Sequence, residues 1–164
     1  MRALVIIGRA PCVRTDYENL FMMGLPEHDN LCVGIDSWGW ALSKMKYFAT
    51  YHEEDIPLNA DGSYKIICHK QYMNLVDIIK PIDLKKEPSG SSALLGALVG
   101  IDEGYKKIIL CGCPLEGKDD QGRQYRAFMP GWLHHEKELQ GIVKSMSGLT
   151  AALLGKPTKE WLNN

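Results

Sequence analysis

Residues 87–117 read EPSGSSALLGALVGIDEGYKKIILCGCPLEG and combine a helix signal with a strand signal. A proline and a group of small hydroxyl residues precede an apolar run, which predicts a helix over residues 91–103. The apolar residues 107–112 then predict a short strand that ends on a glycine. A helix followed directly by a buried strand is the repeating unit of an α/β fold, so this stretch favours that class.

The rest of the chain repeats the alternation. Short apolar runs stop abruptly at polar residues or glycine, as in strands that are buried on both faces of a sheet. The predicted strands cover residues 3–8, 31–36, 47–52, 65–69, 76–80 and 107–112. The predicted helices cover residues 17–23, 38–45, 71–75, 91–103 and 131–154. We therefore predict one α/β domain over residues 1–164, with a mostly parallel sheet of five or six strands and the strand 3–8 central.

Composition and charge exclude several classes of protein. Hydrophobic residues make up 45% of the 164 residues and charged residues 24%, which is typical of a globular domain rather than a disordered chain. A formal charge of −1 gives no electrostatic reason to expect a nucleic-acid or membrane partner. No apolar run has the length of a membrane span, and the apolar start is too short for a signal peptide. We expect a cytoplasmic protein.

The five cysteines are odd in number and lie mostly in apolar, strand-like segments. They are Cys12, Cys32, Cys68, Cys111 and Cys113. This pattern predicts free, buried thiols in a reducing compartment. Cys111 and Cys113 have no second pair of ligands at zinc spacing, so we predict no metal site.

Polar residues and glycines collect at the ends of the predicted strands. In parallel α/β sheets, ligands bind in the crevice beyond the carboxyl ends of the strands. The alternative is that the chain simply returns to water at these points. The residues at these ends are Gly8, Arg9, Ala10 and Pro11 after the first strand, Asp36 and Ser37 after the second, His52, Glu53 and Glu54 after the third, His69 and Lys70 after the fourth, and Gly112 and Cys113 after the last.

The start of the helix 91–103 is a second candidate for ligand contact. The backbone N–H groups of a first helical turn are unpaired, and the serine hydroxyls of Ser91 and Ser92 can either cap the helix or donate to an anion. A cap without a ligand is the simpler alternative. Inside the helix, Gly96 and Gly100 predict close packing, since glycine in a helix is otherwise unfavourable.

Two segments resemble a known family. The stretch VIIGRAPCVRTDYENL, residues 5–20, resembles the first turn of small bacterial sialyltransferases that use CMP-sialic acid, and the turn of related motility-accessory-type domains of unassigned function. The stretch SSALLGALVGIDEGYKKIILCGCPLEG, residues 91–117, is similar to the second signature of that family. The resemblance covers residues 1–52 and 89–117 and implies a Rossmann-like three-layer fold.

The resemblance also implies roles for individual residues. The implied nucleotide contacts, together with Ser37 from the strand-end pattern, are Gly8, Arg9, Ala10, Asp36, Ser37, Ser91, Ser92 and Gly112. A short lid over residues 118–131 precedes His134 and His135, which stand where the family has its catalytic histidine. Tyr125 is the tyrosine of this lid, where the family places tyrosine hydroxyls near the leaving phosphate.

Four positions depart from the family pattern. Ala10 replaces a glycine, Cys12 a serine, Asp36 an asparagine and Pro114 an aspartate. An acid at position 36 repels a phosphate or carboxylate unless it accepts a hydrogen bond from a hydroxyl group. The lid is also shorter than the acceptor-binding lid of those enzymes. These departures argue against sialyl transfer itself.

Two hypotheses follow. The first is a glycosyltransferase-like transferase that uses a nucleotide-activated donor, with a histidine as general base and Tyr125 or serine hydroxyls at the leaving phosphate. The second is a non-catalytic module that binds a nucleotide or metabolite, or an assembly factor of a bacteriophage or prophage. Both have a nucleotide-type small molecule as partner and no cofactor of their own.

Trp161, in the last apolar segment, predicts docking on its own subunit or on another copy in a homo-oligomer.

Overall fold

The computed structural model describes residues 2–34, 45–58, 62–82, 88, 90–118 and 124–164. Seven described strands form one sheet in the order β5-β4-β3-β2-β1-β6-β7, and all six neighbouring pairs are parallel. The strands are β1 (Ala3–Ile7), β2 (His28–Val33), β3 (Met45–Ala49), β4 (Lys65–Cys68), β5 (Ile78–Ile79), β6 (Ile108–Cys111) and β7 (Val143–Ser145). The predicted α/β class with a parallel sheet is confirmed, with one strand more than predicted.

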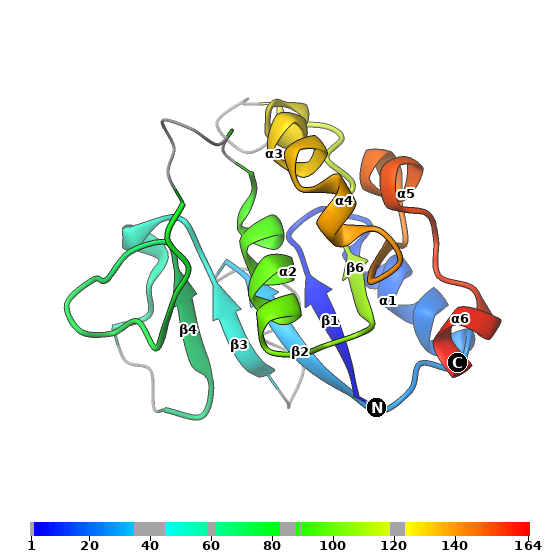
Figure 1. Cartoon of the computed structure of the whole chain (residues 1–164), viewed down its shortest axis with the longest axis horizontal. Coiled ribbons are helices and arrows are strands. Elements are labelled where there is room, and N and C mark those ends of the chain that lie inside the picture. Colours follow the sequence, from blue (N-terminus) through cyan, green and yellow to red (C-terminus); the bar gives the residue numbers. More distant parts are fainter. Residues whose placement is uncertain (1, 35–44, 59–61, 83–87, 89, 119–123) are drawn as a thin grey trace.

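Helices cover both faces of this sheet, which gives three layers (Figure 1). The described helices are α1 (Val13–Met22), α2 (Ser92–Asp102), α3 (Met129–His134), α4 (Glu136–Leu139), α5 (Gly148–Leu154) and α6 (Lys159–Asn163), with the short 3₁₀ turns η2 (Glu53–Asp55) and η3 (Tyr125–Phe128). Helix α2 runs opposite to the strands, so its first turn lies at the edge where the strands end (Figure 1).

Strand β1 shows why the sheet is covered on both sides. All five of its residues are fully buried, and successive side chains point to opposite faces. Leu4 and Ile6 pack in the core beneath α2, whereas Val5 and Ile7 pack in the core that includes residues of α1 and α6. The strand predicted to be central, β1, lies between β2 and β6, one position away from the middle strand, β2. Because both faces of β1 are covered, the strand requires a continuous apolar run, as the sequence indicated.

Close packing of α2 on the sheet is confirmed at its two glycines. A methyl group on Gly96 would come within 2.9 Å of the Leu31 side chain, and one on Gly100 within 2.7 Å of the Leu4 side chain. Every residue from position 93 to position 100 of this helix is buried. Glycine is needed because the sheet occupies the space of a side chain.

The predicted long helix over residues 131–154 is wrong. The chain instead forms α3, α4, the edge strand β7 and α5. Gly141, with a φ of +79°, turns the chain after α4, and Val143 and Ser145 are then fully buried in β7. The strand is only three residues long, so its period-2 pattern is too short to stand out from the surrounding helical pattern.

Other boundaries also shift. Helix α1 begins at Val13 rather than residue 17, because the chain turns directly after Pro11 and the amide of Val13 donates to the carbonyl of Ala10 at 2.9 Å. Strand β2 begins at His28 because Asp29 and Asn30, although polar, are buried in it. Residues 71–75 form a turn rather than a helix, with φ values of 45° at Met73 and 59° at Asn74. The helix predicted over 38–45 falls almost entirely outside the described residues.

The C-terminal segment docks on its own chain. Trp161 is half-buried, packs against the core that contains residues of α1, and donates a hydrogen bond from Nε1 to the carbonyl of Gly141 at 3.1 Å. Its neighbour Leu162 is 1% exposed. This is the first of the two placements that the sequence predicted for Trp161.

Candidate functional site

A cleft of about 440 Å³ lies at the carboxyl ends of the strands, at the point between β1 and β6 where the strand order reverses. From β1, the chain adds β2, β3, β4 and β5 in turn on one side of β1. It then adds β6 on the other side of β1, and β7 follows beyond β6. The connection after β1 enters α1 on one face, and the connection after β6 leads to α3 and α4 on the face of α2 (Figure 1). Loops that diverge in this way open a crevice, which is the usual ligand site of such sheets. We call this the switch-point cleft.

The floor of the switch-point cleft is made of two backbone turns in direct contact. The amide of Gly8 donates to the carbonyl of Cys111 at 2.8 Å, and the amide of Ala10 donates to the carbonyl of Gly112 at 3.2 Å. A methyl group on Gly8 would overlap the carbonyl group of Gly112. Gly112 has a φ of +68°, and a methyl group there would lie 2.5 Å from Cβ of Val13. Both glycines are therefore required by the contact between the turns, before any ligand is considered.

Asp16 fixes this floor and was not among the predicted site residues. Its side chain is 5% exposed, and Oδ2 accepts hydrogen bonds from the amide of Gly112 at 2.8 Å and from the hydroxyl of Ser147 at 2.7 Å. The carboxylate thus ties α1 to the end of β6 and to the residue before α5. No sequence pattern separates a buried acid of this kind from an ordinary acid in the first turn of a helix.

The α2 side of the cleft presents hydrogen-bond donors. Oγ of Ser91 accepts from the amide of Leu94 at 3.4 Å and from Nε1 of Trp132 at 3.3 Å. A serine oxygen has two lone pairs and one hydrogen, so these two bonds leave the hydrogen of Ser91 to donate to a third group. Oγ of Ser92 accepts from the amide of Tyr51 at 3.1 Å and keeps its hydrogen as well. The first-turn N–H groups of α2 add to this set of donors.

Basic side chains also line the switch-point cleft. Arg9 follows the floor turn. Lys118 belongs to the lining together with Tyr125 and Phe128, and we call the part of the cleft that these three residues line its mouth. The arginine side chain lies against Gly34, where a methyl group would come within 2.7 Å of its Cδ atom. Two cations, the positive end of a helix dipole and hydroxyl donors face one space, so the floor and the α2 wall are suited to an anion.

The wall beyond β3 has a different chemistry. Thr50, Tyr51, His52 and Asp55 line the cleft there. Oγ1 of Thr50 accepts from the amide of His52 at 2.9 Å, which fixes the bend where the strand ends. Tyr51 stacks on His69 with ring centroids 5.3 Å apart. Burial and the charge of Lys70 lower the pKa of His69, so the imidazole behind this wall tends to be neutral.

Cys113 lines the cleft but is not a reactive thiol. The side chain is 7% exposed, and burial raises its pKa well above the ordinary value, with a further contribution from Asp16. Its Sγ donates to the carbonyl of Cys111 at 3.6 Å. A protonated thiol is a poor nucleophile and a poor metal ligand, so this cysteine forms part of the apolar lining.

The described ends of the predicted lid segment come together at the mouth of the cleft. Lys118 and Gln124 form an antiparallel bridge, and the amide of Tyr125 donates to the carbonyl of Gly117 at 3.2 Å. This brings Tyr125 and Phe128 to the cleft, where both side chains contribute to the lining. The tip of the segment, residues 119–123, lies outside the described residues.

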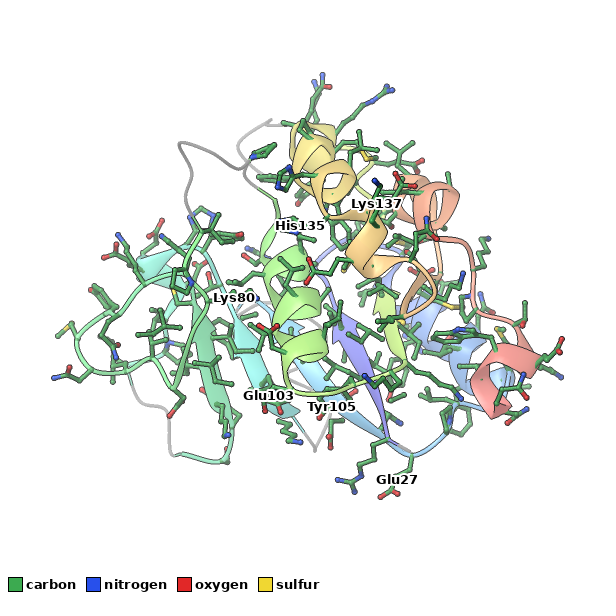
Figure 2. The ribbon with its side chains drawn as sticks, viewed as in Figure 1. Glu27, Lys80, Glu103, Tyr105, His135 and Lys137 are labelled. Carbon is green, nitrogen blue, oxygen red and sulfur yellow. The ribbon has the colours of Figure 1, made fainter. Side chains whose placement is uncertain are left out.

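His134 and His135 do not line the switch-point cleft. His134 is exposed at the end of α3, and the two imidazole rings lie edge to face with centroids 4.9 Å apart. Nδ1 of His135 lies 3.2 Å from Oε2 of Glu138 at the α3–α4 junction, and the His135 side chain is only 16% exposed (Figure 2). The structure therefore does not bring either histidine together with Ser92 and Gly112, as the sequence-based prediction required.

The structure brings together most of the ligand contacts that the sequence predicted. The predicted residues that line the cleft are Gly8, Arg9, Ala10, Ser91, Ser92, Gly112 and Tyr125. Asp36 and Ser37 lie outside the described residues. The predicted site residues did not include several other lining residues, among them Thr50, Tyr51, Asp55, Lys118 and Phe128. Asp55 lies three residues after a strand end that the sequence did indicate, so a wider search around that end would have included it.

No protein-family model, curated protein or solved structure matches this chain. In the part of the chain that the structure describes, no group of three or more histidine, cysteine or acidic side chains is arranged to hold a metal ion. None of the described helices is both long enough and apolar enough to cross a membrane.

Proposed function

We propose that this chain binds a nucleotide, or a nucleotide-activated donor, in the switch-point cleft. The observation that carries the proposal is the set of donors on one side of the cleft. Ser91 and Ser92 both use their oxygens to accept from the protein, so that their hydrogens remain for a ligand beside the first turn of α2. A phosphate group supplies the acceptors that this wall requires.

The remaining features of the cleft support a ligand larger than phosphate alone. Its volume of about 440 Å³ falls within the range of small-molecule sites. Arg9 and Lys118 can neutralise a phosphate group, while the aromatic rings of Tyr125 and Phe128 at the mouth can pack against a base or a sugar ring.

A thermal-shift screen of nucleoside mono- and diphosphates and nucleotide sugars tests this proposal. A ligand that binds only the native state at a hundredfold excess over its Kd stabilises that state by about 2.7 kcal/mol. For a chain of this size, we expect a rise in Tm of roughly 5 to 10 °C. No shift with any phosphate-containing compound at millimolar concentration would contradict the proposal.

A pair of lysine variants tests whether the binding takes place in this cleft. Lys118→Gln removes a cation from the mouth, and we expect affinity for a nucleoside monophosphate to fall roughly fivefold. Lys137→Gln removes the same charge from the exposed outer side of α4 and is the control (Figure 2). Equal effects of the two substitutions would show that only the net charge of the protein matters.

Group transfer is the second candidate function, and one observation favours it. His52 and Tyr125 both belong to the lining of the cleft, so an imidazole and a phenol are available at one site. The histidine would act as general base toward an acceptor hydroxyl. In a turnover assay with a nucleotide sugar, His52→Ala should lower the rate by about a hundredfold or more, while His134→Ala and His135→Ala should leave it unchanged. The opposite pattern would return the role to the histidines of α3.

A further inference from the structure

Three consecutive acidic residues follow β3, and their side chains have different surroundings. Glu53 forms an ion pair with Lys70. Glu54, whose side chain is 77% exposed, has its Oε1 atom 3.5 Å from Nδ1 of His52. Asp55 is half-buried and lines the switch-point cleft, and no cation among the described residues pairs with it. It is therefore the one acid of the three that a ligand in the cleft would meet.

The position of Asp55 is fixed by its surroundings. Its amide donates to the carbonyl of His52 at 3.1 Å, and the amide of Ile56 donates to the carbonyl of Glu53 at 3.1 Å. Ile56 is 3% exposed and anchors the turn η2 in the core beside β4. Asp55 is thus held in the lining of the cleft by a backbone that is fixed on both sides.

Asp55 lies in the same cleft as the donors of α2. The hydrogen bond from the amide of Tyr51 to Oγ of Ser92, 3.1 Å long, joins the end of β3 directly to the first helical turn. A carboxylate only accepts hydrogen bonds, whereas the α2 wall donates them. The cleft therefore has two chemically opposite walls, and a single ligand must satisfy both.

These two walls restrict the ligand, if the proposed function is correct. A phosphate group placed at α2 would be repelled by Asp55 at close range, so the part of the ligand near Asp55 must be uncharged or a hydrogen-bond donor. The two oxygens of a carboxylate can accept from two adjacent hydroxyl groups at once. We propose that Asp55 selects a phosphate ester whose organic part carries vicinal hydroxyl groups, as a ribose does.

The test compares Asp55→Asn with Glu54→Gln, which removes the same charge one residue earlier and outside the cleft. Binding is measured by calorimetry, in EDTA, for three probes: the ribonucleoside 5′-monophosphates, their 2′,3′-dideoxy counterparts and inorganic pyrophosphate. We expect Asp55→Asn to weaken binding of the ribonucleotides about ten- to a hundredfold, as for hydrogen bonds to a charged group. Dideoxy binding should stay within about twofold, and pyrophosphate binding should be equal or tighter, since a repulsive charge is gone.

The possible outcomes separate this inference from the proposed function. If wild-type protein binds none of the probes, both proposals fail. If wild-type protein binds ribonucleotides and Asp55→Asn does not change the preference for them over the dideoxy compounds, only the role of Asp55 fails. An effect of Asp55→Asn that appears with Mg²⁺ but not in EDTA would overturn the hydroxyl role in favour of a bridging cation. Equal melting temperatures of the two variants confirm that both are folded.

Discussion

The two ends of the sheet hold their charged groups in opposite ways. At the amino end, Asp29 is 8% exposed, and each of its oxygens has a partner: Oδ1 accepts from Arg2 at 3.2 Å, and Oδ2 accepts from Lys46 at 3.0 Å and from the hydroxyl of Tyr105. Glu103 accepts from Tyr47 at 3.1 Å nearby (Figure 2). We call these residues the amino-end network.

At the carboxyl end, Ser91, Ser92 and Asp55 line the cleft, and no hydrogen bond between Asp55 and either serine is found among the described residues. A buried polar group is stable only when it is paired, so the amino-end network contributes to folding. Groups that face an open cleft can be paired by a ligand instead. The comparison indicates that the polar groups of the amino-end network are paired within the fold, whereas the polar groups that line the cleft are available to a ligand.

The largest expected effect concerns the floor of the cleft, which belongs to the fold although it lies at the carboxyl end. Gly8→Ala places a methyl group against the backbone of Gly112, which cannot rotate away, so we expect a loss of about 3 kcal/mol in the free energy of unfolding. Gly24→Ala is the control, because Gly24 has a φ of +89° but open space around it. It should cost about 1 kcal/mol. Urea denaturation measures both, and equal losses would refute the role of the backbone contact.

Breaking the amino-end network should have the next largest effect. Asp29→Ala removes the acceptor of Lys46, Tyr105 and Arg2, and we expect a loss of about 2 kcal/mol in the free energy of unfolding. Glu27→Ala removes the other ion-pair partner of Arg2, but its side chain is 72% exposed, so no measurable change is expected. Binding of a nucleotide should be the same in both variants. A loss of binding in Asp29→Ala without a loss of stability would contradict the division between the two ends.

The pH dependence of the free energy of unfolding tests the pairing of Asp29 within the amino-end network. Burial raises the pKa of Asp29, but hydrogen bonds from Tyr105 and Lys46 and the charges of Lys46 and Arg2 outweigh it and lower the pKa below its ordinary value of 3.8. The unfolded chain therefore binds a proton at a higher pH than the folded chain, and the contribution of Asp29 is present above about pH 4 and lost as pH falls below it. Wild-type protein should lose more stability between pH 5 and about pH 3 than Asp29→Asn does. Parallel curves would show that the network does not lower this pKa.

The smallest expected effect on stability is at the cleft itself. Asp55→Asn removes a charge that has no partner among the described residues, so the free energy of unfolding should change by less than about 0.5 kcal/mol. This holds even though the same substitution is expected to change ligand binding strongly. A large loss of stability would mean that Asp55 supports the fold, as Asp29 does.

The sequence by itself determined the α/β class and most of the strands, and it placed the ends of β1, β4, β5 and β6 to within one residue, whereas β2 and β3 end three residues earlier than predicted. Continuous apolar runs such as those of β1 and β6 are required where a strand is covered on both faces, so they are visible without any tertiary information. The strand ends indicated Gly8, Arg9 and Gly112, and the predicted helix start indicated Ser91; all four line one cleft. Close packing of α2 was likewise evident from Gly96 and Gly100.

Only the tertiary structure decided which polar groups are paired and which are left for a ligand. Asp16, Asp29 and Asp55 are one residue type, yet the first holds the floor, the second closes the amino-end network and the third faces the cleft. Strand β7 and the pairing of His135 with Glu138 depended on the turn at Gly141 and on the break between α3 and α4. The physical reason is that a pairing depends on the distance between groups far apart in the chain, which local patterns of hydrophobicity do not encode.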